Sequence, residues 1–140
     1  MVLKLNPASG VPIYLQLMEQ IKYAIETGAV RAGEQLPGIR RLAEDLVMNP
    51  NTVAKAYREL EHEGVIELRH GSGAFVSENG GNGRGRADRF DKAKPVLEAA
   101  MRTIASLGLT EEEMRRLFEN ELNELRERRG RAAGNGRTSH

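Results

Sequence analysis

Residues 49–62, NPNTVAKAYRELEH, constrain the fold more than any other stretch, because both the start and the buried side of a helix are defined there. Asn49 is a favourable N-cap, since its side-chain oxygen can accept a backbone N–H from the first turn. Pro50 fits the first helical position, where no N–H is needed. Apolar residues then recur at steps of three and four and predict one buried face: Val53, Ala56, Tyr57 and Leu60. We therefore predict an amphipathic helix that presents its first turn outward, with the Tyr57 ring in the core.

The polar side of this helix suits a DNA groove. Asn and Thr side chains can bond base edges or phosphates, and Lys and Arg supply charge-assisted contacts. The residues expected on or beside this side are Asn51, Thr52, Lys55 and Arg58. A solvated surface helix shows the same pattern, so the neighbouring segments must decide between the two interpretations.

The preceding segments predict two more helices. Apolar residues keep helical spacing from Ile13 to Ile25 and stop at Gly28, and a second, shorter run extends from 38 to 46. About three residues join this second helix to the helix that follows Asn49, which is the helix-turn-helix pattern. A glycine in that turn would favour the pattern, because such a turn often needs a positive φ, but Val47 stands there instead.

The apolar pattern changes to a period of two after Gly64. Residues 65–69 and 74–77 are short enough to pair as strands, with Gly71 and Gly73 in the turn between them. A hairpin directly after a helix-turn-helix is the wing of a winged-helix domain. Arg69 and His70 are expected at its tip, where they could contact a phosphate or the minor groove.

The C-terminal half predicts a linker and two helices. Residues 78–88 are rich in Gly, Asn and Arg and are expected to be flexible, and the polar residues 130–140 are expected to be a disordered tail. Residues 89–129 predict two helices whose apolar faces are too wide for two helices to bury alone. They either pack back on the first domain or pair with the same helices of a second chain, and we favour the second. The residues expected to form this dimer contact are Val96, Leu97, Ala100, Met101, Ile104, Leu117, Phe118 and Leu122.

Composition excludes several classes of protein. The 140 residues contain no cysteine, which argues against disulfides and thiolate metal sites, and no apolar run approaches the length of a membrane span. The three histidines have no metal-ligand spacing, and no nucleophile has an implied base, so we expect no enzyme, metal or cofactor. The net charge of +1 does not by itself indicate a nucleic-acid partner. A cytoplasmic protein without a membrane partner is expected.

The segments LPGIRRLAEDL, NPNTVAKAYRELEHEGVI and HGSGAFV, in this order, resemble the DNA-binding domain of the GntR family of bacterial transcription regulators. The resemblance covers about residues 10–77. Within that family, NPNTV with KAY and a very short helical C-terminal region resembles the YtrA-type subfamily. The resemblance implies a dimer that binds an inverted-repeat operator, usually as a repressor.

The resemblance also implies which residues contact DNA. Carried over by position, the contacts fall on Arg40 in the second helix, on Asn51 and Thr52 in the recognition helix, and on the wing; Lys55 and Tyr57 are weaker transfers. Pro50 and Ala54 stand where other subfamilies can carry contacting arginines, so base recognition cannot be copied from those. The full set of expected DNA-binding residues is Arg40, Asn49, Asn51, Thr52, Lys55, Arg58, Arg69, His70, Gly71 and Gly73.

We thus expect a mainly α protein with a small β-hairpin: a winged helix-turn-helix domain over residues 1–77, followed by a two-helix C-terminal dimerisation region. The expected partners are double-stranded DNA and a second copy of the chain. Two alternatives remain open. One is a regulator that also binds a small-molecule effector at the dimer interface, and the other is a winged-helix module for protein assembly that has lost DNA binding.

Overall fold

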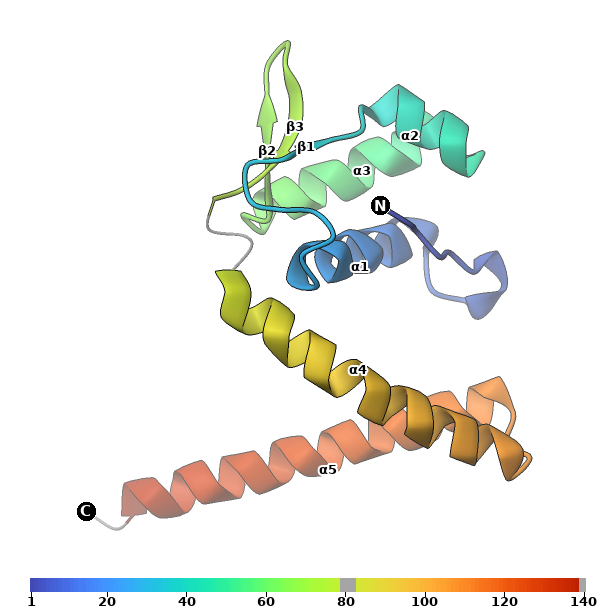
Figure 1. Ribbon diagram of the computed structural model, residues 1–140, viewed down its shortest axis with the longest axis vertical. Coiled ribbons are helices and arrows are strands. Elements are labelled where there is room, and N and C mark those ends of the chain that lie inside the picture. Colours follow the sequence, from blue (N-terminus) through green and yellow to red (C-terminus); the bar gives the residue numbers. More distant parts are fainter. Residues whose placement is uncertain (79–82, 139–140) are drawn as a thin grey trace. The chain divides into compact units, whose positions relative to one another are not determined.

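The computed structural model describes residues 1–78 and 83–138 and divides the chain into two compact units, Met1–Ala93 and Lys94–His140 (Figure 1). The expectation of a mainly α protein with a small β component is confirmed. The elements of the first unit, in order, are η1 (Pro7–Ser9), α1 (Ile13–Glu26), β1 (Gln35–Leu36), α2 (Ile39–Leu46), α3 (Pro50–His62), β2 (Ile66–Arg69) and β3 (Gly73–Val76). They are followed by α4 (Gly83–Ser106), in which the first unit ends, and by α5 (Glu111–Thr138).

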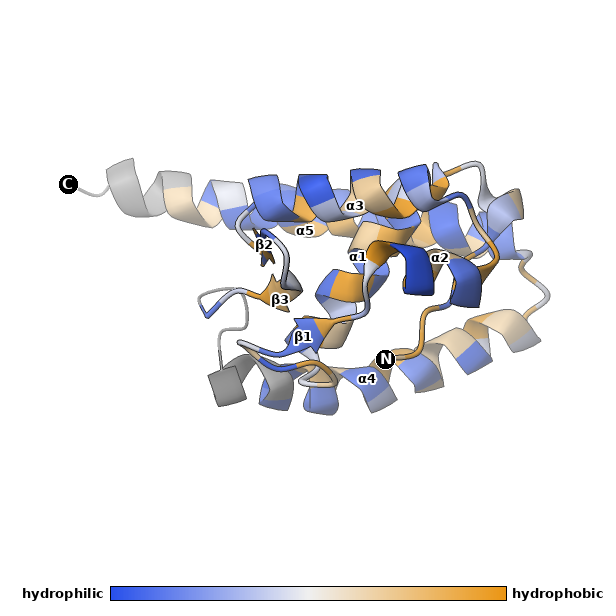
Figure 2. Cartoon of the chain, turned by 90° about the horizontal axis from the view of Figure 1, so that it is seen from above, coloured by the Kyte–Doolittle hydropathy of each residue, from blue (hydrophilic) through white to orange (hydrophobic). Residues whose placement is uncertain are grey.

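Helix α3 is at the centre of the first unit and packs against α1, α2 and β2 (Figure 1). Its four predicted core residues, Val53, Ala56, Tyr57 and Leu60, are all 0% exposed. They meet Leu17 and Ile21 of α1, Leu42 and Ala43 of α2, and Ile66 and Val76 of the strands in one hydrophobic cluster. Helix α3 is thus held from several sides, while its N-terminal residues Pro50 and Asn51 stay exposed. The outer side of α2 is hydrophilic (Figure 2).

The wing belongs to a three-stranded antiparallel sheet in the order β1-β3-β2. The predicted hairpin is present and is extended by a third strand, because Gln35 and Leu36 pair with Phe75 and Ala74 of β3. A strand of two residues is too short to show alternation in the sequence, and only its partner strand defines it. The central strand is therefore β3, and its other edge pairs with β2 over four residues.

The turn between α2 and α3 takes the left-handed conformation that the helix-turn-helix pattern needs, although it contains no glycine. Val47 has φ 52° and ψ 57°, the only positive φ of a non-glycine residue in the described ranges. Its side chain is 91% exposed, so its packing does not explain why a valine holds this conformation.

The N-terminal arm of the first unit is bound to α1 through a glutamine side chain. Gln16 accepts a hydrogen bond from the Asn6 backbone N–H at 2.7 Å and donates to the Asn6 carbonyl at 2.9 Å. Leu3 and Leu5 pack against the edge of the core. The arm thereby extends the packed surface beyond the three helices.

Helices α4 and α5 are longer than the sequence predicts. Helix α4 begins at Gly83, so the expected linker 78–88 is wrong from there on, and residues 79–82 lie outside the described residues. Helix α5 continues to Thr138, so the expected disordered tail is wrong up to that residue, and residues 139–140 lie outside the described range. Once a helix exists, each added residue gains a backbone hydrogen bond at small cost, which lets polar segments with arginine and alanine continue it.

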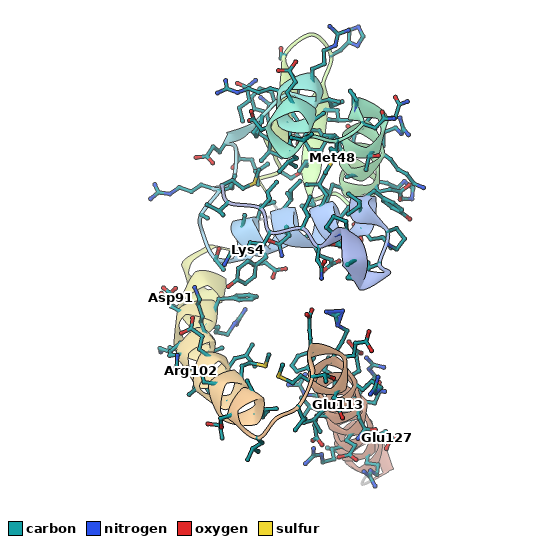
Figure 3. The ribbon with its side chains drawn as sticks, turned by 90° about the vertical axis from the view of Figure 1, so that its right-hand side faces the viewer. Lys4, Met48, Asp91, Arg102, Glu113 and Glu127 are labelled. Carbon is teal, nitrogen blue, oxygen red and sulfur yellow. The ribbon has the colours of Figure 1, made fainter. Side chains whose placement is uncertain are left out.

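The second unit carries many exposed apolar side chains. Hydrophobic and hydrophilic residues alternate along α4 and α5 (Figure 2), and side chains project from both helices, as at Arg102, Glu113 and Glu127 (Figure 3). Val96 is 71% exposed and Phe118 is 48% exposed. Of the residues expected at the dimer contact, only Ile104 is half-buried, and the others are exposed. None of the described helices is both long and apolar enough to cross a membrane.

Candidate nucleic-acid interface

The first turn of α3 is built as the sequence predicts. The Asn49 side-chain oxygen accepts a hydrogen bond from the Asn51 backbone N–H at 2.8 Å, and Pro50 takes the first helical position. The cap occupies this oxygen and leaves the side-chain amide nitrogen of Asn49 for an outside partner. Asn51 is exposed and Thr52 is half-buried at the rim. Two polar side chains thus stand at a helix N-terminus, where the backbone dipole also favours phosphate.

Lys55 lies one turn further along α3 and is held by an aromatic ring of α1. Its ammonium nitrogen is 4.0 Å from the centroid of the Tyr14 ring, a cation–π arrangement that limits where the charge can go. Tyr14 lines one shallow groove together with Ile13, Asn51, Thr52 and Lys55. The position of Tyr14 in the sequence carries no signal that its ring would meet Lys55.

Arg40 is exposed at the second position of α2. The N-cap of this helix is Gly38, which has no side chain, so the first-turn N–H groups of α2 have no side-chain cap. By contrast, the start of α3 is capped by the Asn49 side chain. Arg40 lines a second shallow groove with Asn49 and Pro50, so the beginnings of the two helices share one surface.

The wing turn forms a separate group of expected DNA-binding residues. Arg69 and His70 are exposed, and the turn closes with a hydrogen bond from the Ser72 N–H to the Arg69 carbonyl at 2.9 Å. Gly71 and Gly73 have φ values of 79° and 114°, which suit glycine. The Arg69 guanidinium lies 4.1 Å from the Phe75 ring centroid and 3.4 Å from a Glu67 oxygen, so it is held along the flank of the hairpin. The hairpin tip projects away from the helices (Figure 1).

Tyr57 lies on the inner side of α3 and is fully buried, as the sequence predicts for its ring. Its hydroxyl donates a hydrogen bond to the Pro37 carbonyl at 2.6 Å. Burial raises the pKa of this hydroxyl far above its usual value, so it stays protonated and remains a donor at neutral pH. Tyr57 is therefore not a direct DNA contact, and its weaker assignment as one is wrong.

The structure brings most of the expected residues into two adjoining grooves and one separate turn. Arg40 and Asn49 line one groove, and Asn51 and Thr52 line the other with Lys55 and Tyr14. Arg58 is exposed on α3, one turn beyond Ala54 and away from the helix start. Within residues 1–78, no hydrogen bond or ion pair joins the wing turn to the first turn of α3. The expected residues thus form one group at the starts of α2 and α3 and another at the wing turn.

Metal-binding clusters and unsatisfied buried polar groups are both absent from the described part of the chain. No group of three His, Cys, Asp or Glu residues there could hold a metal ion. All buried side-chain polar atoms in that part have hydrogen-bond partners. The surface is thus one of exposed amide, hydroxyl and cationic groups, a set that suits recognition of a polyanion.

Comparisons with known proteins agree with this geometry. The model of the gntR family of bacterial regulatory proteins matches residues 13–76. Over 78 residues the chain is 45% identical to the HTH-type transcriptional repressor YtrA of Bacillus subtilis, a match that covers 56% of this chain and 60% of YtrA. It is 37% identical over 111 residues to the transcriptional regulator YhcF of the same organism, covering 76% of this chain and 86% of YhcF.

A solved structure extends the likeness to the fold. YtrA from Sulfolobus acidocaldarius, a GntR-family transcription factor, shares 31% sequence identity at a TM-score of 0.53, and the match covers 72% of this chain and 98% of that one. The resemblance to YtrA-type regulators inferred from the sequence motifs is confirmed. The winged-helix fold, the family model and the identity to YhcF over most of its length together show that this chain belongs to the GntR family of DNA-binding bacterial transcription regulators.

Proposed function

We propose that the chain is a repressor that binds an inverted-repeat operator as a homodimer. The observation that carries the proposal is the division of α3 into two sides. Four of its residues are 0% exposed and fix the helix in the core, while Asn51 and Lys55 in its N-terminal half and Arg58 further along remain exposed. A helix held this firmly on one side can present a reading surface in the major groove on the other.

Within this proposal the side chains divide the work by chemistry. Asn51 and Thr52 read base edges, since an amide can bond an adenine edge in two places and a hydroxyl can bond either kind of base. Lys55, Arg58 and Arg40 bind phosphates and set the position of the head on the duplex. Asn49 adds its side-chain amide nitrogen at the same end of the helix.

The wing supplies a further phosphate or minor-groove contact in this proposal. Arg69 and His70 are exposed beside the two glycines of the turn, whose missing side chains let the backbone come close to the DNA. Because Arg69 is held by Phe75 and Glu67, its charge is presented in one place along the hairpin. A positioned cation loses less conformational entropy on binding than a free one.

The dimer contact proposed here is made by α4 and α5. Val96, Leu97, Met101, Leu117, Phe118 and Leu122 are exposed large apolar residues of these helices. Such a set is unusual on a free surface and marks an interaction site. A second copy, which carries the same residues, would cover it by two-fold symmetry, and the two reading helices would then meet half-sites about one helical turn apart.

The test is binding by fluorescence anisotropy to a fragment from upstream of the protein's own gene, with a scrambled duplex of equal length as the control. Selective binding whose affinity falls linearly in log salt is expected, and the slope measures how many phosphates are bound. Repression is tested by transcription in vitro from the bound promoter. Absence of any preference in a pool of genomic fragments would instead support a protein-assembly module. In the cell the proposed place of action is the cytoplasm, where bacterial DNA is found.

A further inference from the structure

One hydrogen bond joins the buried side of the reading helix to the segment that leads into α2. The Tyr57 hydroxyl, on α3, donates to the Pro37 carbonyl at 2.6 Å, and the tyrosine is 0% exposed. The two partners are twenty residues apart in the chain. A buried hydroxyl without a hydrogen-bond partner would lower the stability of the fold, so this bond is a specific feature of the packing.

Pro37 stands where the DNA-facing elements of the head meet. Leu36, just before it, pairs with Ala74 of the wing strand β3. Gly38, just after it, is the N-cap of α2 and makes no side-chain capping bond. The carbonyl of Pro37 is thus a fixed point between the wing sheet and a helix start that lacks a cap of its own.

We propose that Tyr57 is a positioning residue that holds the start of α2, and with it Arg40, at a set place relative to the reading helix α3. The inference rests on the proposed function, in which Arg40 binds a phosphate. A binding site holds its ligand best when the supporting structure keeps its groups within about 0.5 Å of the productive geometry. The Tyr57 hydroxyl supplies this restraint from inside the domain, without touching DNA.

The variant that tests this is Tyr57→Phe, which keeps the ring in the core and removes only the hydroxyl. Its operator affinity is expected to fall about tenfold, the factor for removing one charge-assisted hydrogen bond. The slope of log affinity against log salt is expected to decrease by about 0.9 for each phosphate that is no longer bound. Arg40→Ala should produce the same two changes, and the double variant should add little to either single one, since both act on the same phosphate.

A matched control separates positioning from reduced stability. Ile21→Val removes one methyl group from another 0% exposed core residue, which lies on α1. This control is expected to lower the melting temperature and leave the salt slope unchanged. A second measurement needs no DNA: hydrogen exchange at the Leu42 amide, which bonds to the Gly38 carbonyl at 2.9 Å, should accelerate in Tyr57→Phe more than in the control.

The outcomes distinguish this inference from the proposed function. If Arg40→Ala reduces affinity and slope but Tyr57→Phe behaves like Ile21→Val, the positioning role is overturned and the binding of a phosphate by Arg40 stands. Additive effects in the double variant would also overturn it. If Arg40→Ala itself changes nothing, the phosphate-binding role of Arg40 in the proposed function fails, and the positioning role fails with it because Arg40 then has no phosphate to meet.

Discussion

The Met48 backbone N–H bonds to the Ala43 carbonyl at 2.9 Å, across the end of α2. A second bond inside it, from the Val47 N–H to the Glu44 carbonyl at 3.2 Å, completes the pair that closes a helix around a left-handed residue. Glycine normally holds that place, because any Cβ is crowded there. Helix α2 therefore ends with the pair of hydrogen bonds that usually surrounds a glycine, but here the left-handed residue is a strained valine.

Replacing this valine should stabilise the head. Val47→Gly removes a Cβ from a left-handed conformation and sacrifices no packing, since the side chain is 91% exposed. The gain in the free energy of unfolding is expected to be about 1 kcal/mol, after the entropy cost of glycine is subtracted. Thermal melting should show a rise of about 4–8 °C for a domain of this size. Val47→Ala, which keeps a Cβ, is the control, and equal gains in both variants would rule out backbone strain as the cause.

Replacing Arg40 and Asn51 by alanine should change two different properties of DNA binding, the overall affinity and the discrimination between duplexes. Arg40→Ala is expected to weaken operator and scrambled duplex together and to reduce the salt slope, because a bond to phosphate carries no sequence information. Asn51→Ala is expected to lose about 1–3 kcal/mol of discrimination between the two duplexes, the value of one amide–base pairing. Anisotropy titrations on both duplexes measure this, and proportional losses in the two variants would contradict the division of roles.

The wing should be sensitive to a single methyl group at Gly73. A Cβ there would lie 2.9 Å from the side-chain amide nitrogen of Gln35. The backbone φ of 114° is also one that residues other than glycine rarely adopt. Gly73→Ala is expected to destabilise the head by about 1–3 kcal/mol, measured by urea unfolding, and to weaken operator binding. Gln35→Ala is the control, because it removes the 2.9 Å bond from this amide to the Ser72 carbonyl without backbone strain. A loss of stability in Gly73→Ala no larger than in the control would exclude strain.

The start of α5 should respond to acid through one carboxylate. The Thr110 backbone N–H donates to the Glu113 carboxylate at 2.9 Å, and the Thr110 hydroxyl oxygen accepts from the Glu113 backbone N–H at 3.1 Å. This reciprocal capping box holds the pKa of Glu113 below its ordinary 4.5. A lowered folded pKa means that this stabilisation is complete above pH 4.5 and is lost as the pH falls through the lower value.

The Glu113 side-chain carbon reports this titration by NMR. Its midpoint should lie below 4.5, and Thr110→Ala should move it upward. A midpoint unchanged by that variant would mean that the Thr110 side chain contributes nothing to the shift.

A charge placed on the exposed apolar side of α5 should separate the proposed dimer. Phe118→Glu puts a carboxylate where the second copy would bury an aromatic ring, and burying an unpaired charge is costly. Sedimentation should report a monomer, and operator affinity should fall by about 10²–10⁴, the avidity of two linked heads. Glu119→Gln, on the neighbouring exposed position, is the control and should remain a dimer. A dimeric Phe118→Glu protein with full affinity would place the contact elsewhere.

The sequence predicted best where local chemistry defines an element completely. The cap at Asn49 and the spacing of Val53, Ala56 and Leu60 gave α3 its bounds to within one residue, and the change to a period of two located the wing. At Val47 the helix-turn-helix pattern predicts a positive φ, whereas a valine disfavours one. The structure has the positive φ, because the packing of the two helices determines the turn.

The features that sequence reasoning missed depend on partners distant in the chain. Strand β1 exists because β3 lies beside it, and its two residues carry no period. The meeting of Lys55 with Tyr14 and of the Tyr57 hydroxyl with Pro37 depends on how α1, α2 and α3 pack, which spacing within one helix does not encode. The helical ends of α4 and α5 were missed for another reason, since glycine content outweighed helix propagation in the prediction.

The separation of α3 into an anchored side and an exposed side also bears on how such regulators diversify. The side chains of Asn51, Lys55 and Arg58 are exposed and lie outside the buried core, so we expect a substitution at any of them to change the stability of the head only slightly. In the proposed function Asn51 reads a base edge, so a duplicated gene could acquire a new operator preference by a substitution at Asn51 that leaves stability unchanged. Substitutions at Lys55 or Arg58, proposed to bind phosphates, would instead change the overall affinity for DNA.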